Sequence, residues 1–181
     1  MVYLFLAEGF ETVEALAPAD ILRRGKVNIK TVGVGSKTIR SSHGIDVIAD
    51  ITTDEVVLDD QVEAVILPGG MPGTLNLEKS PAVIDAVKYC CKRNILIGAI
   101  CAAPSILGHL GMLKGKKATA FPGFEKDLEG AVYENGYVEH DGNIITARGM
   151  GVAVEFGLEL LSALKGRESA AQVKAAIQCR N

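Results

Sequence analysis

The stretch from Asn94 to Leu107, NILIGAICAAPSIL, most constrains how this chain can fold. It begins with an apolar run over 95–100, which only Gly98 interrupts. Such a run is typical of a strand buried on both faces of a parallel sheet. The run ends at Cys101, and the small residues and Pro104 that follow favour an immediate helix start. A strand, one cysteine and a helix predict a nucleophile elbow that presents a thiol at the carboxyl end of the sheet.

The predicted helix start also bears on the reactivity of Cys101. Backbone N–H groups and the positive end of a helix dipole favour a thiolate, so the elbow predicts a lowered thiol pKa. A buried structural cysteine that ends a strand has the same local pattern. The local pattern therefore leaves a reactive and a structural cysteine both open.

Composition limits the classes of protein to which the chain can belong. Its 181 residues, 48% of them hydrophobic, predict one globular domain over residues 1–181 with a full core. The formal net charge of -3 and the lack of a basic cluster argue against nucleic acid as a partner. The sequence shows neither a signal peptide nor an apolar run as long as a membrane span. We therefore expect a cytoplasmic protein with no membrane partner.

The cysteines and histidines do not have the spacing of metal ligands. The four cysteines include no C-x-x-C pair, so free thiols in a reducing compartment are the simplest interpretation. The three histidines, His43, His109 and His140, lie far apart in the sequence. We expect neither a metal nor a cofactor.

Hydrophobic periodicity predicts strands that alternate with helices. The predicted strands cover residues 2–7, 29–34, 45–49, 62–67, 95–100, 117–120, 132–139 and 143–146. The predicted helices cover residues 11–24, 81–92, 104–110, 124–129, 152–164 and 168–177, and residues 33–38 are interpreted as a polar turn. This alternation predicts a three-layer α/β sandwich with a mainly parallel sheet. Binding sites in such sheets lie beyond the carboxyl ends of the strands.

Glu14 is the second unusual residue. On the predicted helix over 11–24 it shares a face with Ile21, because residues seven apart differ by only about 20°. This places a carboxyl group beside the end of the first strand. A partly buried carboxylic acid has a raised pKa, and it could hydrogen-bond a thiolate or carry a proton. A solvated glutamate at a helix start is the alternative, and Glu11 fits that description as well.

The glycine loop after the predicted strand over 62–67 could add backbone donors. Gly69 and Gly70, together with the N–H of Ala102, could bind an oxyanion, although an ordinary glycine turn has the same sequence. No histidine lies near Cys101 in the sequence. A Cys–His dyad is therefore not evident, and a spatial approach of His140 stays open.

Five stretches of the chain form a specific combination when they occur in this order. They are Leu6–Glu11 with Glu14, Leu67–Gly70, Ala99–Pro104, Arg148–Gly151 and Ala171–Val173. On these stretches the whole chain resembles the DJ-one/ThiJ/PfpI superfamily, and most of all the branch of the parkinsonism-associated protein and its bacterial relatives. The resemblance implies a flavodoxin-like sandwich that forms a homodimer. It also implies that Cys101 is the reactive, oxidisable cysteine and that Glu14 is its protonated partner.

The same resemblance assigns the surroundings of the thiol. It implies that the backbone of Gly69, Gly70 and Ala102 lines the site and that Glu11 lies at its edge. Phe121 and Met150 also belong to the predicted site, but they depart from the family pattern.

Three departures from the family pattern bear on activity. Peptidase-type members carry histidine where Ala102 stands, and the human protein has histidine where Phe121 stands before Pro122. Met150 replaces the usual proline of the Arg-Gly-Pro-Gly loop. A peptidase is therefore disfavoured, and the pocket wall is expected to differ.

The resemblance implies two functions of different classes. The first is a cofactor-independent glyoxalase III-like or deglycase-like enzyme that converts a small aldehyde, methylglyoxal or glyoxal, to a hydroxy acid. In this reaction a thiolate adds to the aldehyde, the carboxyl group moves protons and N–H groups hold the oxyanion. The alternative is a redox-sensing, oxidative-stress-response protein or chaperone without a dedicated substrate, in which oxidation of Cys101 is the functional event.

Overall fold

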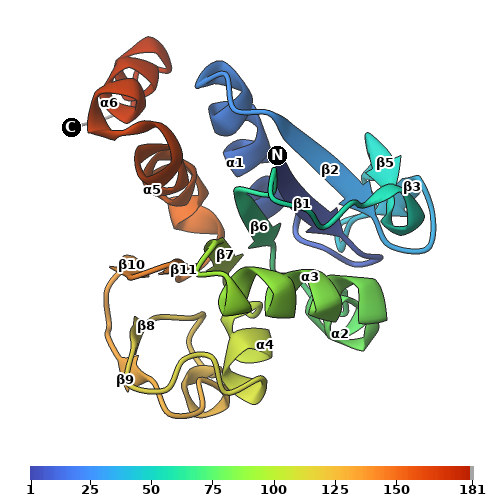
Figure 1. Cartoon of the computed structure of the whole chain (residues 1–181), viewed down its shortest axis with the longest axis vertical. Coiled ribbons are helices and arrows are strands. Elements are labelled where there is room, and N and C mark those ends of the chain that lie inside the picture. The colour runs from blue at the N-terminus through green and yellow to red at the C-terminus, as the bar shows by residue number, and fades with distance from the viewer. Residues whose placement is uncertain (180–181) are drawn as a thin grey trace.

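A seven-stranded sheet forms the centre of the molecule in the computed structural model, which describes residues 1–179. Its strand order is β10-β11-β7-β6-β1-β2-β5, and Figure 1 shows the sheet between two groups of helices. The strands of this sheet are β1 (Val2–Leu6), β2 (Ile29–Gly33), β5 (Ile51–Thr52), β6 (Ala64–Leu67), β7 (Leu96–Ile100), β10 (Val138–Asp141) and β11 (Ile144–Ala147). All neighbours are parallel except β10 and β11.

Six helices cover the two faces of the sheet (Figure 1). They are α1 (Thr12–Arg24), α2 (Gly73–Lys79), α3 (Pro81–Lys92), α4 (Pro104–His109), α5 (Ala153–Lys165) and α6 (Arg167–Ala176). In β1, Val2, Leu4 and Leu6 pack in one core with α1, α5 and α6. Tyr3 and Phe5 point to the opposite core, which α2, α3 and α4 cover. This alternation, with both faces buried, confirms the predicted three-layer α/β architecture.

The structure differs from the sequence prediction mainly in short elements. Helix α2 was not predicted, because its seven residues, GTLNLEK, are too few to show a helical period. The residues taken as a polar turn end in β3 (Thr38–Arg40), which pairs with β4 (Asp46–Ile48) in a separate hairpin. Only one residue of β3, Ile39, is buried, so the strand carries almost no hydrophobic signal.

The segment between α4 and β11 is also more broken than predicted. The strand expected over 117–120 is β8 (Lys117–Ala118), and it pairs with β9 (Val132–Tyr133) outside the main sheet. The expected helix over 124–129 is a 3₁₀ turn, Glu125–Asp127. The strand expected over 132–139 is split into β9 and β10 by residues 134–137, which include a glycine.

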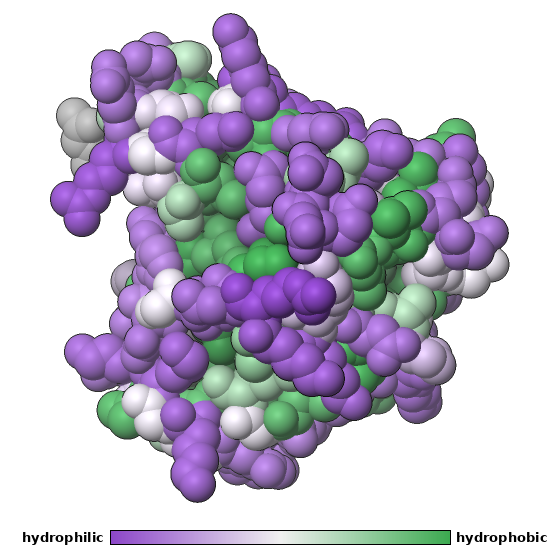
Figure 2. All heavy atoms as spheres, viewed as in Figure 1, coloured by the Kyte–Doolittle hydropathy of each residue, from purple (hydrophilic) through white to green (hydrophobic). Residues whose placement is uncertain are grey.

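The carboxyl ends of four neighbouring parallel strands bring the predicted site together. Leu6, Leu67, Ile100 and Ala147 are the last residues of β1, β6, β7 and β11. The segments that follow them contain the candidate site residues, as expected for a parallel sheet. Hydrophilic side chains cover most of the face in Figure 2, and apolar residues reach that surface mainly between the helices. Within residues 1–179, no helix is long and apolar enough to span a membrane.

Candidate active site

Cys101 lies in a strained turn between β7 and α4. Its φ of 67° is in the left-handed region, which residues other than glycine rarely adopt. The N–H of Cys101 donates to the carbonyl of Ala147 at 2.8 Å, and its own carbonyl accepts from the N–H of Phe121 at 2.9 Å. Two neighbouring loops thus hold the turn, and the half-buried side chain has the elbow geometry that the sequence predicts.

Glu14 is a buried carboxyl group in the first turn of α1, with only 1% of its surface exposed. Its Oε2 accepts the N–H of Gly69 at 3.0 Å, and the backbone N–H of Met150 also hydrogen-bonds the carboxyl group. Burial raises the pKa of Glu14 to about 7, and the charge of Glu11 adds to this effect. The hydrogen bonds of Cys101, Gly69 and Met150 act in the opposite direction. A solvated Glu14, the alternative from the sequence, is therefore excluded.

Glu11 supports Glu14 rather than the thiol. It is the N-cap residue of α1, and its Oε2 accepts the N–H of Glu14 at 2.8 Å. Its backbone N–H donates to the carbonyl of Gly69 at 2.9 Å. Glu11 therefore fixes the helix start to the glycine loop, at the edge of the site where the family resemblance predicts it.

The glycine loop approaches the side chains of Cys101 and Glu14 too closely for any residue other than glycine at position 69. A Cβ on Gly69 would lie 2.7 Å from both the Cβ of Cys101 and the Oε2 of Glu14. The N–H groups of Gly70 and Ala102 lower the pKa of the Cys101 thiol, whereas the N–H of Gly69 donates to Glu14. Of the three predicted oxyanion donors, Gly69 therefore donates to the carboxyl group, and Gly70 and Ala102 stay predictions.

The sequence prediction of a lowered thiol pKa is wrong for the thiol beside an ionised Glu14. Burial, the charge of Glu14 and its hydrogen bond raise the pKa of Cys101 to about 12, against the smaller opposite effect of Ala102 and Gly70. The helix start lowers the thiol pKa, but the desolvation of the sulfur and the adjacent carboxylate raise it by more. Because the two groups hydrogen-bond each other, their titrations belong to the pair. Above about pH 7 the pair retains one proton between sulfur and carboxylate.

An apolar cavity of about 370 Å³ lies next to residues that contact the pair, and neither Cys101 nor Glu14 is among its lining residues. It is lined by Phe121, Pro122, Tyr137, Arg148, Gly149, Met150, Gly151 and Val152. Phe121 and Met150 were predicted as site residues, and both lie in its wall. Tyr137 was missed, because it belongs to the loop before β10 and no sequence motif connects it to Cys101.

The histidines contact other parts of the molecule. His109 pairs with Glu78 at 2.6 Å, and His140 pairs with Glu159 at 2.7 Å. Within residues 1–179, no hydrogen bond joins either histidine to Cys101. The spatial Cys–His dyad that the sequence left open with His140 is therefore not formed.

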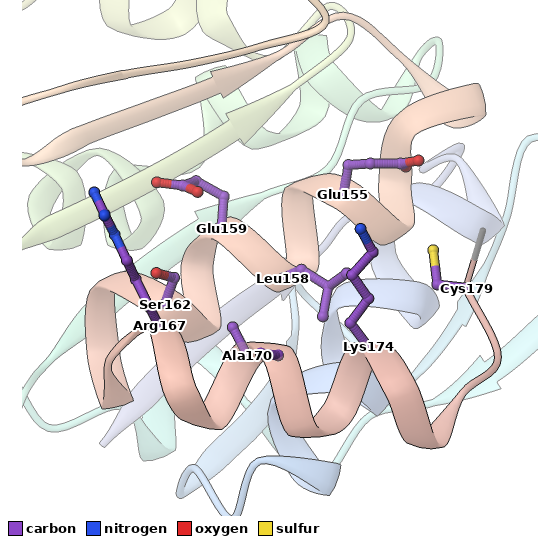
Figure 3. A pocket seen from close by; sticks show the side chains of 9 residues that line it. Glu155, Leu158, Glu159, Ser162, Arg167, Ala170, Lys174 and Cys179 are labelled. Atoms are coloured by element: carbon purple, nitrogen blue, oxygen red, sulfur yellow. The ribbon is translucent and has the colours of Figure 1, made fainter. Parts of the chain in front are cut away.

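A larger cavity, of about 540 Å³, lies between α5 and α6 and away from this pair (Figure 3). Charged side chains of both signs surround it, Glu155 and Glu159 from α5, and Arg167 and Lys174 from α6. The thiol in its lining is that of Cys179, and within residues 1–179 no buried carboxyl group accompanies it as Glu14 accompanies Cys101. The chemistry of the molecule is therefore expected at Cys101.

Known proteins with the same fold and length support a family assignment. Residues 1–163 match the DJ-1/PfpI family. The chain is 35% identical to a Parkinson disease protein 7 homolog of Danio rerio over 95% of this chain and 93% of that protein. It is also 35% identical to protein DJ-1alpha of Drosophila melanogaster, over 96% and 82% of the two chains.

Solved structures agree with the sequence comparison. A DJ-1 superfamily protein from Salmonella typhimurium, solved as a cysteine-to-alanine mutant, superposes with a TM-score of 0.93 at 34% identity, over 99% of this chain and 98% of that one. Oxidized DJ-1 from Toxoplasma gondii gives a TM-score of 0.93 at 31% identity, over 98% and 97% of the chains. The chain belongs to the DJ-1/PfpI family.

Proposed function

We propose that the chain is a cofactor-independent cysteine enzyme that converts small 2-oxoaldehydes, methylglyoxal or glyoxal, to 2-hydroxy acids. The observation that carries this proposal is the pairing of Cys101 with a buried Glu14 whose pKa is raised to about 7. A carboxyl group that titrates near neutral pH can accept a proton and return it, as general acid–base catalysis requires.

The first step uses the pair in its singly protonated form. The sulfur of Cys101 attacks the aldehyde carbon while the thiol proton passes to the Glu14 carboxylate. The N–H groups of Gly70 and Ala102 lie at the sulfur, where the new oxyanion forms, and stabilise it. Glu14 then protonates that oxygen, and the product is a hemithioacetal.

The second step is an internal redox exchange that needs no cofactor. The Glu14 carboxylate removes the hydrogen of the former aldehyde carbon, and a proton is delivered to the neighbouring ketone carbon. The hydroxyl proton on the former aldehyde carbon passes to the ketone oxygen, so that the aldehyde carbon is oxidised to a thioester and the ketone is reduced to an alcohol. Water cleaves the thioester and releases the 2-hydroxy acid and the free thiol.

The pH profile of turnover tests this role of Glu14. With the pKa of Glu14 at about 7, kcat/KM for methylglyoxal should rise through pH 7, because the carboxylate is the proton acceptor. Glu14→Gln should lose this inflection and about 10²-fold of turnover. Cys101→Ser should lose turnover entirely. Turnover by Glu14→Gln at the wild-type rate would contradict a catalytic carboxylate.

Redox sensing is the second candidate function, and the two N–H groups at the sulfur favour it. Donors that hold a developing oxyanion would also hold the oxygens of a sulfinate. A relative of known structure, DJ-1 from Toxoplasma gondii, was solved in an oxidized form. After peroxide treatment, mass spectrometry should find sulfinate on Cys101 in the wild type and in Glu14→Gln. Oxidation spread evenly over all four cysteines would contradict this function.

A homodimer is proposed from an apolar surface over α1 and β4. Leu16 and Ile48 line the same surface depression and are 36% and 75% exposed. Val13 on α1 and Ile45 beside β4 are exposed as well. A second copy of the chain would cover these side chains, in agreement with the family resemblance. We also propose that the chain forms one domain over residues 1–181.

A further inference from the structure

We propose that the cavity beside Cys101 binds an aryl group, so that the enzyme prefers aromatic 2-oxoaldehydes to methylglyoxal. This inference rests on the proposed function and names the substrate class for it. Three segments form the cavity: the loop after β8 with Phe121, the loop after β11 with Gly149 and Met150, and the segment before β10 with Tyr137.

The two loops meet directly at the cavity. A Cβ on Gly149 would lie 3.2 Å from Cδ2 of the Phe121 ring, so the ring lies against a glycine backbone. The N–H of Arg148 donates to the carbonyl of Tyr137 at 2.9 Å, which fixes the second aromatic residue to the same wall. Backbone contacts thus fix the segments that carry the two aromatic residues.

The cavity is adjacent to both groups that carry the proposed chemistry. The N–H of Phe121 donates to the carbonyl of Cys101 at 2.9 Å. A Cβ on Gly149 would lie 3.9 Å from Oε1 of Glu14, and the N–H of Met150 hydrogen-bonds the same carboxyl group. A substituent on a 2-oxoaldehyde attacked at Cys101 is therefore next to the cavity wall.

The size and surface of the cavity fit a planar apolar group. An apolar cavity of about 150 Å³ is large enough for benzene, and this one measures about 370 Å³. Phe121, Tyr137 and Met150 are 48%, 68% and 55% exposed, so much of their apolar surface has no partner within residues 1–179. Aromatic rings and a thioether pack well against an aryl ring. A methyl group would leave most of this surface in water.

The reaction balances for an aryl substrate without any further reactant than water. Phenylglyoxal gains one water and becomes mandelate. The sulfur of Cys101 bonds to the aldehyde carbon, the hydrogen of that carbon is transferred as a proton to the ketone carbon, and water breaks the carbon–sulfur bond. The aldehyde carbon loses two electrons and the ketone carbon gains the same two, so no external oxidant or reductant is needed.

The test compares kcat/KM for phenylglyoxal with kcat/KM for methylglyoxal in each variant. This ratio removes any change that affects both aldehydes equally. Initial rates are needed, because phenylglyoxal also modifies arginine side chains. Phe121→Ala and Tyr137→Ala should each lower the ratio by about 10-fold, the effect expected for the loss of apolar contacts to a substrate. Tyr133→Ala, an exposed tyrosine of β9 outside the cavity, is the matched control and should leave the ratio unchanged.

Two results would overturn the inference while leaving the proposed function intact. One is methylglyoxal turnover with a ratio that Phe121→Ala and Tyr137→Ala do not change. The other is a ratio that rises in either variant. Mandelate binding to Cys101→Ser, followed by protein NMR, gives a readout that does not need catalysis. We expect mandelate to shift the NMR signals of Phe121 and Tyr137 more than lactate does. This result supports the aryl site even if neither aldehyde is turned over, and equal shifts contradict it.

Discussion

Replacing Glu14 by glutamine should make the thiol of Cys101 more acidic while it lowers turnover by about 10²-fold. In the wild type, burial, the charge of Glu14 and its hydrogen bond raise the thiol pKa, in this order of importance. Glutamine carries no charge, and its N–H can donate to a thiolate. Two of the three causes therefore disappear, and burial remains.

The size of this effect follows from the Coulomb interaction of two close charges. Two unit charges about 4 Å apart in a medium of effective dielectric constant about 20 repel each other by ~4 kcal/mol. At about 1.4 kcal/mol for each pKa unit, this corresponds to roughly 3 units. The thiol pKa rises from 9.0 to about 12 in total, and burial is the largest cause. The Coulomb figure is therefore an upper bound, and we expect the thiol pKa to fall by about 1–2 units in Glu14→Gln.

The rate of alkylation of Cys101 by iodoacetamide, measured from pH 6 to 10 by mass spectrometry, reports the thiolate directly. At pH 8 the variant should react about 10–100-fold faster than the wild type, since each pKa unit changes the thiolate fraction tenfold. Glu168→Gln, which removes an exposed carboxylate of α6, is the matched control and should behave as the wild type. Equal alkylation of the wild type and Glu14→Gln would refute the reasoning. It would mean that Glu14 already keeps the shared proton and leaves the sulfur ionised.

Three further predictions concern stability and assembly. The pKa of Glu14 is about 7 when folded and about 4.5 when unfolded, so the unfolded chain releases this proton first and stability falls as pH rises from about 4.5 to 7. Urea unfolding should therefore show the stability advantage of Glu14→Gln over wild type growing by about 3 kcal/mol between pH 4 and 8. Gly69→Ala should cost about 1–3 kcal/mol of unfolding free energy, because its Cβ has no room, whereas Gly151→Ala meets open space and should cost little. Ile48→Glu should yield a monomer in sedimentation experiments, and Val57→Glu, at another exposed apolar residue (58% against 75% for Ile48), should not.

The sequence predicts the fold well because its strongest signals are local. The apolar run before Cys101 and the small residues after it define β7, the turn and the start of α4 within a few positions. The alternation of strands and helices then determines the layers and places the site at the carboxyl ends of the strands. Strand β4 was expected within residues 45–49, but its partner β3 and the short α2 escape prediction because they bury few side chains.

The properties of the site are harder to predict, because they depend on groups that tertiary structure brings together. The burial of Glu14 can be predicted from its helix face. The raised pKa of Cys101 cannot, because it depends on the distance between the two side chains. The use of the Gly69 N–H by Glu14 also depends on the position of α1 against the glycine loop. Tyr137 reaches the cavity through a loop with no motif.

The cost of Glu14 to stability is itself an argument for function. A carboxyl group held protonated to about pH 7 reduces the stability of the folded protein at neutral pH by about 3 kcal/mol relative to an uncharged side chain. Packing does not require it, because a glutamine has nearly the same shape and could donate and accept hydrogen bonds at the same place. The left-handed backbone of Cys101 is a second feature that lowers the stability of the folded protein. It lies at the same place, because Gly69 packs against Cys101 as well as Glu14. Two destabilising features at one sulfur are expected where a protein needs a proton shared between two groups. We therefore propose the chemistry at the Cys101–Glu14 pair and not at the larger cavity between α5 and α6.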